Sequence, residues 1–151
     1  MTAEDIYEKA VANLGNHLTL NPAVPAERGC AEAVSDLLKM AGVQGIPAKG
    51  YASTIDLCNW LSTNPIFQET HAPTFGGVVI SPTNGNTIGH TGIILKHGIA
   101  SNDSSTGRFQ ENYSLQGWYH TFTEIKGLPT RYFALYTPST LPTKNSCKIQ
   151  V

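Results

Sequence analysis

Apolar residues in the first part of the chain recur every three or four positions, which is the spacing of one helical face. This pattern covers residues 3–14 and then runs from Cys30 to about Ala41. A glycine follows each pattern, Gly15 and Gly42, and supplies a stop signal. The sequence therefore predicts two amphipathic helices, and the second begins at a cysteine.

A third, shorter helix is predicted to begin after Ser53. The run Ser53-Thr54-Ile55-Asp56 has the form of a capping box in which Asp replaces Glu or Gln. Ile55, Cys58 and Leu61 would then lie on one side of this helix, so we predict that Cys58 is a core residue. Pro65 and Pro73 break the helical pattern, and the chain between them is predicted to be loop.

From residue 76 the pattern changes to short β-rich runs that are separated by turn residues. We expect strands over residues 76–81, 89–96, 99–102, 119–125 and 131–136. Helices followed by an antiparallel meander indicate the α+β class, with the N-terminal helices packed on an antiparallel β-sheet. A meander leaves one sheet face free for the Cys30 helix, which would set the start of that helix against the central strands.

Length and charge narrow the classes of protein to which the chain can belong. Residues 1–151 are predicted to form a single domain, with residues 137–151 as a loose C-terminal extension. The formal net charge of -1 does not suggest a nucleic-acid partner. We expect no membrane span and no secretory signal, because the chain lacks the long apolar run and the basic N-terminal segment that these require. The protein is therefore expected to be made in the cytoplasm.

Cys30 is the first candidate for chemistry. The chain has three cysteines, an odd number that does not make a disulfide framework. A thiol in the first turn of a helix lies beside unpaired backbone N–H groups and the positive end of the helix dipole, which favour the thiolate. The alternative is that Cys30 is a small buried hydrophobe at the start of a core helix.

His90 is the obvious partner for a nucleophilic Cys30. It begins a predicted strand in which His90, Gly92 and Ile94 share a face, and Gly92 leaves room for another backbone or a substrate. A Cys–His couple needs a third group to orient the imidazole. The next strand offers Asn102, with Asp103 on the opposite face as the alternative if a bulge shifts the register. Without Cys30, His90 would be read as an ordinary strand histidine.

A metal centre is not expected, although the chain has five histidines. The sequence contains no His-Glu-x-x-His motif and no paired cysteines at zinc-finger spacing. We therefore predict no metal ligands and no cofactor.

The order of these motifs resembles the NlpC/P60 and CHAP families of papain-like cysteine peptidases. The resemblance rests on Gly-Cys-Ala-Glu-Ala-Val at a helix start, then Gly-Gly-Val-Val-Ile and Gly-His-Thr-Gly-Ile-Ile-Leu in strands, and it extends from about Pro25 to Tyr136. It implies a papain-like fold with Cys30 as nucleophile, His90 as base and Asn102 as the third residue. The family commonly has Asp before and Ser after the nucleophile, where this chain has Gly29 and Ala31.

The resemblance further implies a peptidoglycan hydrolase that cleaves an amide bond of the stem peptide through a thioester. The bond between D-Glu and diaminopimelate is our first choice, and the amide between MurNAc and L-Ala is the second. Tyr51, Asp103 and Trp118 are expected to contact substrate; the alternative for the two aromatic residues is a place in the core, where aromatic side chains more often lie. A phage endolysin or an antibacterial toxin would act on the cell wall after lysis or secretion, and a delivered toxin would imply an immunity protein as a partner.

Two other functions are compatible with the same residues. A papain-like effector could act on host proteins or transfer an acyl group. A non-catalytic binding module would instead use Cys30 as a core residue, and thiol reactivity separates this possibility from the other two.

Overall fold

The centre of the structure is an antiparallel sheet of six strands, seen in a computed structural model that describes residues 1–18 and 29–136. The strand order is β1-β6-β2-β3-β4-β5, and all neighbouring strands run antiparallel. The strands are β1 (Phe67–Thr70), β2 (Val78–Ser81), β3 (His90–Leu95), β4 (Gly98–Asn102), β5 (Phe109–Tyr113) and β6 (Arg131–Leu135). The β3–β4 hairpin pairs Leu95 with Gly98 and Gly92 with Ser101, which places His90 at the open end of the hairpin.

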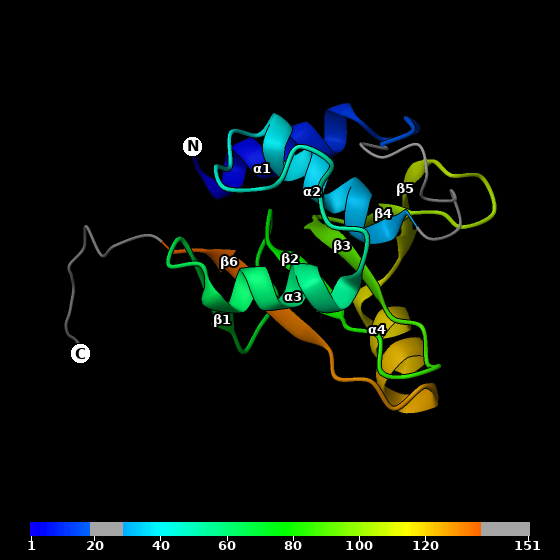
Figure 1. Cartoon of the computed structure of the whole chain (residues 1–151). Coiled ribbons are helices and arrows are strands. Elements are labelled where there is room, and N and C mark those ends of the chain that lie inside the picture. The colour runs from blue at the N-terminus through cyan, green and yellow to red at the C-terminus, as the bar shows by residue number, and fades with distance from the viewer. Residues whose placement is uncertain (19–28, 137–151) are drawn as a thin grey trace, which may run out of the picture.

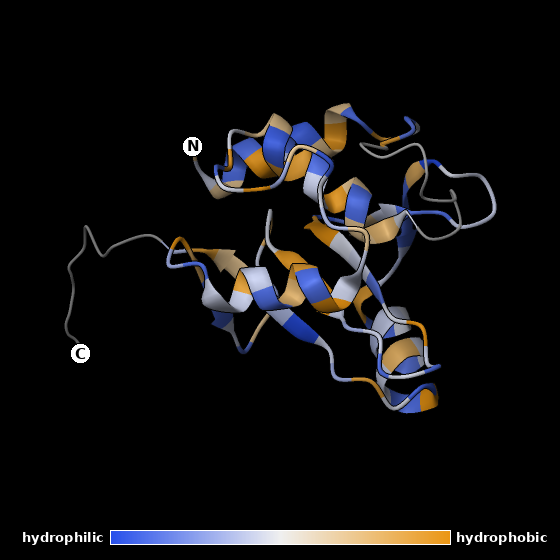
Figure 2. Cartoon of the chain, in the orientation of Figure 1, coloured by the Kyte–Doolittle hydropathy of each residue, from blue (hydrophilic) through white to orange (hydrophobic). Residues whose placement is uncertain are grey.

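Helices α1 (Ala3–Ala12), α2 (Cys30–Met40) and α3 (Thr54–Thr63) cover one face of this sheet (Figure 1). Figure 2 shows apolar and polar positions alternating along α2 and α3, as expected for helices with one buried face. Their apolar side chains share one core cluster with strand residues such as Val78, Ile80 and Ile93. The start of α2 is thereby held against β3 and β4.

The opposite face of the central strands is covered as well. It carries a second cluster, formed by Val79, Ile94 and Ile99 with Trp118 and Phe122. The latter two come from helix α4 (Leu115–Trp118) and the π-helical segment η2 (Tyr119–Ile125) that continues it. As a result, the strands β2 and β4 are buried along their whole length.

The prediction of a strand over residues 119–125 is therefore wrong. The aromatic and β-branched residues of this segment suggested β structure, but Ser114 caps a helix by accepting a hydrogen bond from the Gly117 N–H. Trp118 and Phe122 are four residues apart and both buried, which is the spacing of a helical face. The sheet therefore has helical cover on both faces, with the Cys30 helix on the face where it was expected.

The α+β class and the other expected elements agree with the structure. The three predicted N-terminal helices are present, as are strands close to residues 76–81, 89–96, 99–102 and 131–136. Two strands were not expected, β1 in the segment predicted to be loop and β5 after the polar loop. Each is an edge strand with exposed polar residues, so neither shows a clear apolar pattern. The predicted C-terminal extension, residues 137–151, lies outside the described residues.

Candidate active site

Cys30 is the first residue of α2, and its side chain is partly exposed. Gly29 precedes it and provides no side-chain cap, so the first N–H groups of the helix are not engaged by a capping side chain. Hydrogen bonds from the backbone N–H groups of Ala31, Thr91 and Cys30 itself reach the sulfur and act to lower the pKa of the thiol. Because Thr91 directly follows His90, the sulfur lies against the first residues of β3.

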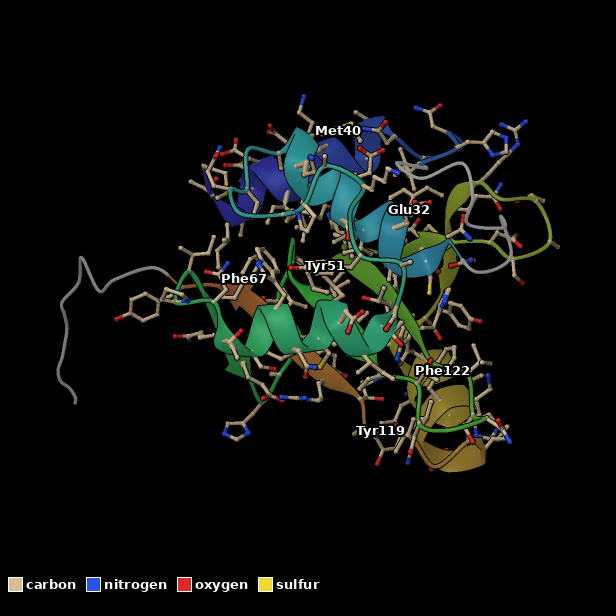
Figure 3. All side chains as sticks on the ribbon, in the orientation of Figure 1. Glu32, Met40, Tyr51, Phe67, Tyr119 and Phe122 are labelled. Atoms are coloured by element: carbon tan, nitrogen blue, oxygen red, sulfur yellow. The ribbon has the colours of Figure 1, made fainter. Side chains whose placement is uncertain are left out.

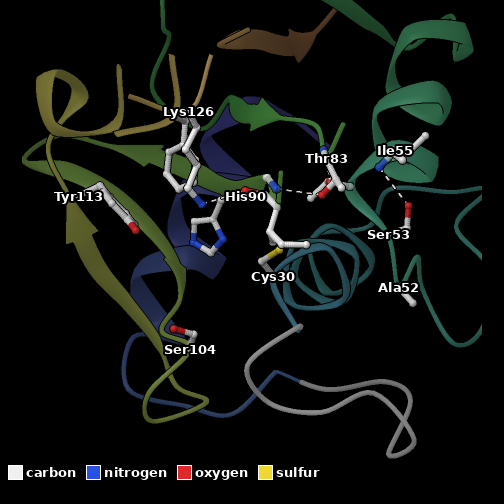
Figure 4. Close-up of a pocket in the computed structure, with 13 residues that line it drawn as sticks. Cys30, Ala52, Ser53, Ile55, Thr83, His90, Ser104, Tyr113 and Lys126 are labelled. Atoms are coloured by element: carbon white, nitrogen blue, oxygen red, sulfur yellow. Dashed lines mark hydrogen bonds between the residues drawn. The ribbon is translucent and has the colours of Figure 1, made fainter. Parts of the chain in front are cut away.

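Cys30 and His90 line the same pocket, which has a volume of about 410 Å³. Figure 4 shows both side chains in this pocket, one from the start of α2 and the other from the start of β3. Its other walls come from the start of α3, the β2–β3 connection, the β4–β5 loop, β5 and η2. The further lining residues include Ala52, Ser53, Thr54, Ile55, Thr83, Ile88, Gly89, Ser104, Tyr113, Phe122 and Lys126.

A short chain of hydrogen bonds fixes the orientation and the tautomer of His90. Its Nε2 atom lies 2.9 Å from Ser101 Oγ, and Ser101 Oγ donates its own hydrogen to Asn112 Oδ1 at 2.6 Å. Since the serine hydroxyl has only one hydrogen, its oxygen must accept from Nε2–H of His90. This leaves Nδ1 of the imidazole without a proton, so Nδ1 is the nitrogen that can act as a base.

The imidazole ring is enclosed by aromatic side chains. It stacks on Trp118 and Phe122 with centroid distances of 5.3 Å and 5.6 Å, and Tyr113 meets it edge-on. Burial disfavours the charged ring and lowers the pKa of His90 to about 4, and the positive charge of Lys126 acts in the same direction. The negative charge of Asp103 opposes this shift. His90 is therefore a neutral base at pH 7.

Burial also governs the state of the Cys30 thiol. Removal from water raises its pKa to about 11, and the backbone hydrogen bonds at the helix start oppose this effect without cancelling it. The expectation that the helix start would hold Cys30 as a thiolate is therefore wrong for the resting protein. At neutral pH the structure holds a neutral thiol beside a neutral imidazole.

The structure places Asn102 differently from the prediction. Asn102 is buried at the end of β4, directly after Ser101, and side chains of successive strand residues point to opposite faces. Ser101 shares the face of His90 because it pairs with Gly92, and Ser101 makes the hydrogen bond that had been assigned to Asn102. Asp103 follows the end of β4, and its negative charge acts to raise the pKa of His90.

None of the three residues expected to contact substrate lines the pocket. Trp118 is fully buried and donates Nε1–H to Ser81 Oγ, so it supports His90 from behind instead of facing the pocket. Tyr51 packs against the helical core beside Trp60, where Figure 3 labels it between α2 and α3, and it does not line the pocket. Asp103 does not line the pocket, although Ser104 does, and its carboxylate accepts hydrogen bonds from the backbone N–H and the hydroxyl of Ser105.

Three residues of the site were missed by the sequence reasoning, namely Ser101, Asn112 and Lys126. The first had a usable signal, because the two-residue turn of the β3–β4 hairpin pairs even-numbered residues of β3 with odd-numbered residues of β4. That rule excludes Asn102 from the His90 face and admits Ser101. Asn112 lies on the unexpected strand β5, and Lys126 follows η2, which had been read as a strand.

Gly92 and Cys58 also have defined places in the structure. A Cβ at Gly92 would lie 2.6 Å from the carbonyl oxygen of Ala100, so this glycine admits the neighbouring strand and not a substrate. Cys58 is buried in the core as predicted. The guanidinium of Arg131 caps its sulfur at 3.1 Å.

Compared with models of known protein families and with curated proteins, the chain matches none. Within residues 1–18 and 29–136, no group of three or more His, Cys, Asp or Glu side chains could hold a metal ion. In the same part of the chain, no helix is both long and apolar enough to cross a membrane.

Proposed function

We propose that this protein is a papain-like cysteine amidase or endopeptidase that cleaves an amide bond of the peptidoglycan stem peptide. The observation that carries the proposal is a thiol at the start of a helix sharing one pocket with a histidine whose tautomer is fixed. The order of these residues along the chain, with Cys30 on the helix and His90 at the start of a strand, supports an NlpC/P60-type fold.

In the first half of the reaction, Cys30 Sγ attacks the amide carbonyl while Nδ1 of His90 takes the thiol proton. Because both groups begin neutral, proton transfer accompanies the attack, and no thiolate needs to accumulate beforehand. The imidazolium then gives this proton to the leaving amine as the C–N bond breaks. The acyl group remains on Cys30 as a thioester.

In the second half, water attacks the thioester and gives a proton to His90. The C–S bond breaks, the carboxylic acid leaves, and His90 returns the proton to the sulfur. The backbone N–H of Cys30, at the start of α2, would donate to the carbonyl oxygen in both halves, because Gly29 offers no side chain that caps this end of the helix. The Ser101–Asn112 pair keeps the ring oriented throughout.

The substrate belongs to the same proposal. The bond between D-Glu and diaminopimelate is preferred, and the amide between MurNAc and L-Ala is the second choice. An endolysin or a delivered antibacterial toxin would bring such an enzyme to the cell wall, and the delivered form would have an immunity protein.

Digestion of purified Gram-negative sacculi tests this function directly. Wild type should release stem-peptide fragments that mass spectrometry identifies, and Cys30→Ala should release none. Cys58→Ala is the matched control, because it removes a core thiol that lies outside the pocket. This variant should retain activity, provided that circular dichroism shows it to be folded.

Intact sacculi after wild-type treatment would contradict the substrate assignment. In that event, acylation of Cys30 by a protein or peptide substrate would instead favour an effector that acts on host proteins or transfers an acyl group. Full activity of Cys30→Ala would remove the nucleophile assignment altogether.

A second candidate is a non-catalytic binding module, and the raised pKa of Cys30 is the observation that favours it. A buried neutral thiol without a catalytic role reacts slowly with alkylating reagents. If His90 serves as the base, His90→Ala should slow the alkylation of Cys30 by iodoacetamide at pH 8. Equal rates in wild type and His90→Ala would favour the binding module.

A further inference from the structure

Lys126 gives the pocket its electrostatic character. Among the described residues that line the pocket, it is the only side chain that carries a full charge at neutral pH. The others are hydroxyl, aliphatic and aromatic residues together with the neutral Cys30 and His90. A solute that enters the pocket therefore meets one positive charge.

The ammonium group of Lys126 is held in position by two contacts. Its Nζ donates to the carbonyl oxygen of Ile88 at 3.0 Å and lies 5.1 Å from the centre of the Phe122 ring. Figure 4 shows this side chain beside the His90 ring. A lysine ammonium has three hydrogens, and Ile88 uses one of them, so the remaining donors are available to a ligand in the pocket.

The opposite side of the pocket does not neutralise this charge. The start of α3 contributes Ser53 and Thr54, whose hydroxyls are occupied by hydrogen bonds within the protein. The carboxylate of Asp103, the residue before Ser104 of the pocket wall, accepts hydrogen bonds from Ser105. No described residue therefore forms an ion pair with Lys126.

We propose that Lys126 is a specificity-determining residue that binds a carboxylate of the substrate next to the scissile amide. This inference rests on the proposed function of Cys30 and His90 and defines its substrate class as an amide with a neighbouring free carboxylate. A carboxylate is the natural partner for an ammonium that is fixed in a pocket and has donors to spare. Lys126 also remains close to His90, so the bound carboxylate would lie beside the base and not at a distant subsite.

This assignment separates the two candidate bonds. D-Glu is a dicarboxylic acid, so it keeps one free carboxylate when the other is joined to diaminopimelate. The amide between MurNAc and L-Ala has no free carboxylate on either side. The position of Lys126 therefore favours cleavage beside D-Glu.

Alkylation of Cys30 with a matched pair of reagents tests the inference without a peptide substrate. Iodoacetate and iodoacetamide both form an S–C bond to Cys30 as iodide leaves, but only iodoacetate carries a carboxylate. The measured quantity is the ratio of their rate constants at pH 8 and low salt, followed by mass spectrometry of the Cys30 peptide. We expect Lys126→Gln to lower the ratio by roughly three- to tenfold, as loss of one nearby charge predicts.

Two further variants make the result specific to the charge at this position. Lys126→Arg should keep the wild-type ratio. Lys96→Gln removes a lysine at the other end of β3, outside the pocket, and should also leave the ratio unchanged. An equal ratio in wild type and folded Lys126→Gln, or an equal fall in Lys96→Gln, would overturn the inference. If Lys126→Gln does not fold, a lower ratio in Lys126→Met supports the inference and an unchanged ratio rejects it.

The outcome can be separated from failure of the proposed function. Alkylation needs a reachable thiol and the local charge, but it needs no hydrolysis. A charge-dependent ratio in a protein that leaves sacculi intact would keep the carboxylate site and reject the peptidoglycan substrate. If sacculi are cleaved but the ratio of the two alkylation rate constants is the same in wild type and Lys126→Gln, the proposed enzyme activity stands and the carboxylate site is rejected.

Discussion

At the scale of single residues, the hydrogen bonds of His90 decide its chemistry more than its place in the sequence does. Ser101 accepts from Nε2–H, and Asn112 accepts from Ser101, so Nδ1 is the nitrogen that would act as the base in the proposed reaction. In the proposed mechanism, this arrangement lets two neutral groups carry out acyl transfer without a resting ion pair. It also makes Ser101 a positioning residue whose loss should be measurable in the ring itself.

Ser101→Ala should lower kcat by roughly ten- to a hundredfold, because the imidazole then loses its fixed tautomer and orientation. The change in KM should be small, since Ser101 is buried beneath the ring and does not line the pocket. Nitrogen NMR of His90 should show a mixture of tautomers in the variant and the Nε2–H form in wild type. A full kcat with an unchanged NMR signature would show that Ser101 has no positioning role.

The pH dependence of activity follows from the low pKa of His90. With a pKa of about 4, the base stays unprotonated well below the usual value near 6.5. We expect kcat/KM to be nearly the same at pH 5.5 and pH 7.5 and to fall only as pH approaches 4. Rates measured across this range would contradict the burial argument if the half-maximal point lay near 6.5.

At the scale of elements, the layer formed by α4 and η2 is what encloses the His90 ring. This layer puts Trp118 and Phe122 against the ring and closes the sheet face that a simple meander would leave open. π-Helical segments are uncommon and often occur at functional sites, and here the segment leads into Lys126. The layer therefore supplies both the environment of the base and the charge in the pocket.

Trp118→Leu should lower the free energy of unfolding by about 2–4 kcal/mol, because it leaves a cavity in the second core cluster. It should also raise the pKa of His90 toward its ordinary value, since the ring loses part of its apolar cover. Tyr119→Leu is the matched control, because Tyr119 follows in the same helical segment but is 49% exposed. Urea denaturation and NMR titration should show both effects in the first variant only.

At the scale of the whole molecule, the partly buried pair Cys30 and His90 links stability to pH at both ends of the range. His90 binds a proton more weakly in the folded protein, so stability falls as pH drops from about 6.5 to about 4. Cys30 holds its proton more strongly in the folded protein, so stability falls as pH rises from about 9 to about 11. Between these limits neither group opposes folding.

The acid side of this dependence can be isolated with His90→Gln. In wild type, His90 should contribute a loss of about 3 kcal/mol in the free energy of unfolding between pH 6.5 and pH 4. The variant should lack this loss of stability, because glutamine does not titrate. Unfolding curves at several pH values for both proteins give the difference. If the free energy of unfolding changes with pH equally in both proteins, the pKa of His90 is the same in the folded and unfolded states.

Much of the local structure could be predicted from the sequence. The helix that begins at Cys30, the core position of Cys58 and the strand that begins at His90 all follow from periodicity and turn residues, which act over a few neighbouring positions. Strand alternation, combined with the length of the hairpin turn, even contains the information that selects Ser101 over Asn102. These features are local, so the sequence by itself determines them.

Tertiary structure decided the features that depend on distant neighbours. Residues 119–125 are helical because Trp118 and Phe122 cover the second face of the sheet, which outweighs the β preference of the segment. β6 pairs with both β1 and β2, so the order of the sheet departs from the order of the chain. The thiol and the imidazole are neutral because burial outweighs the helix start, and burial is set by the residues that fold around a group.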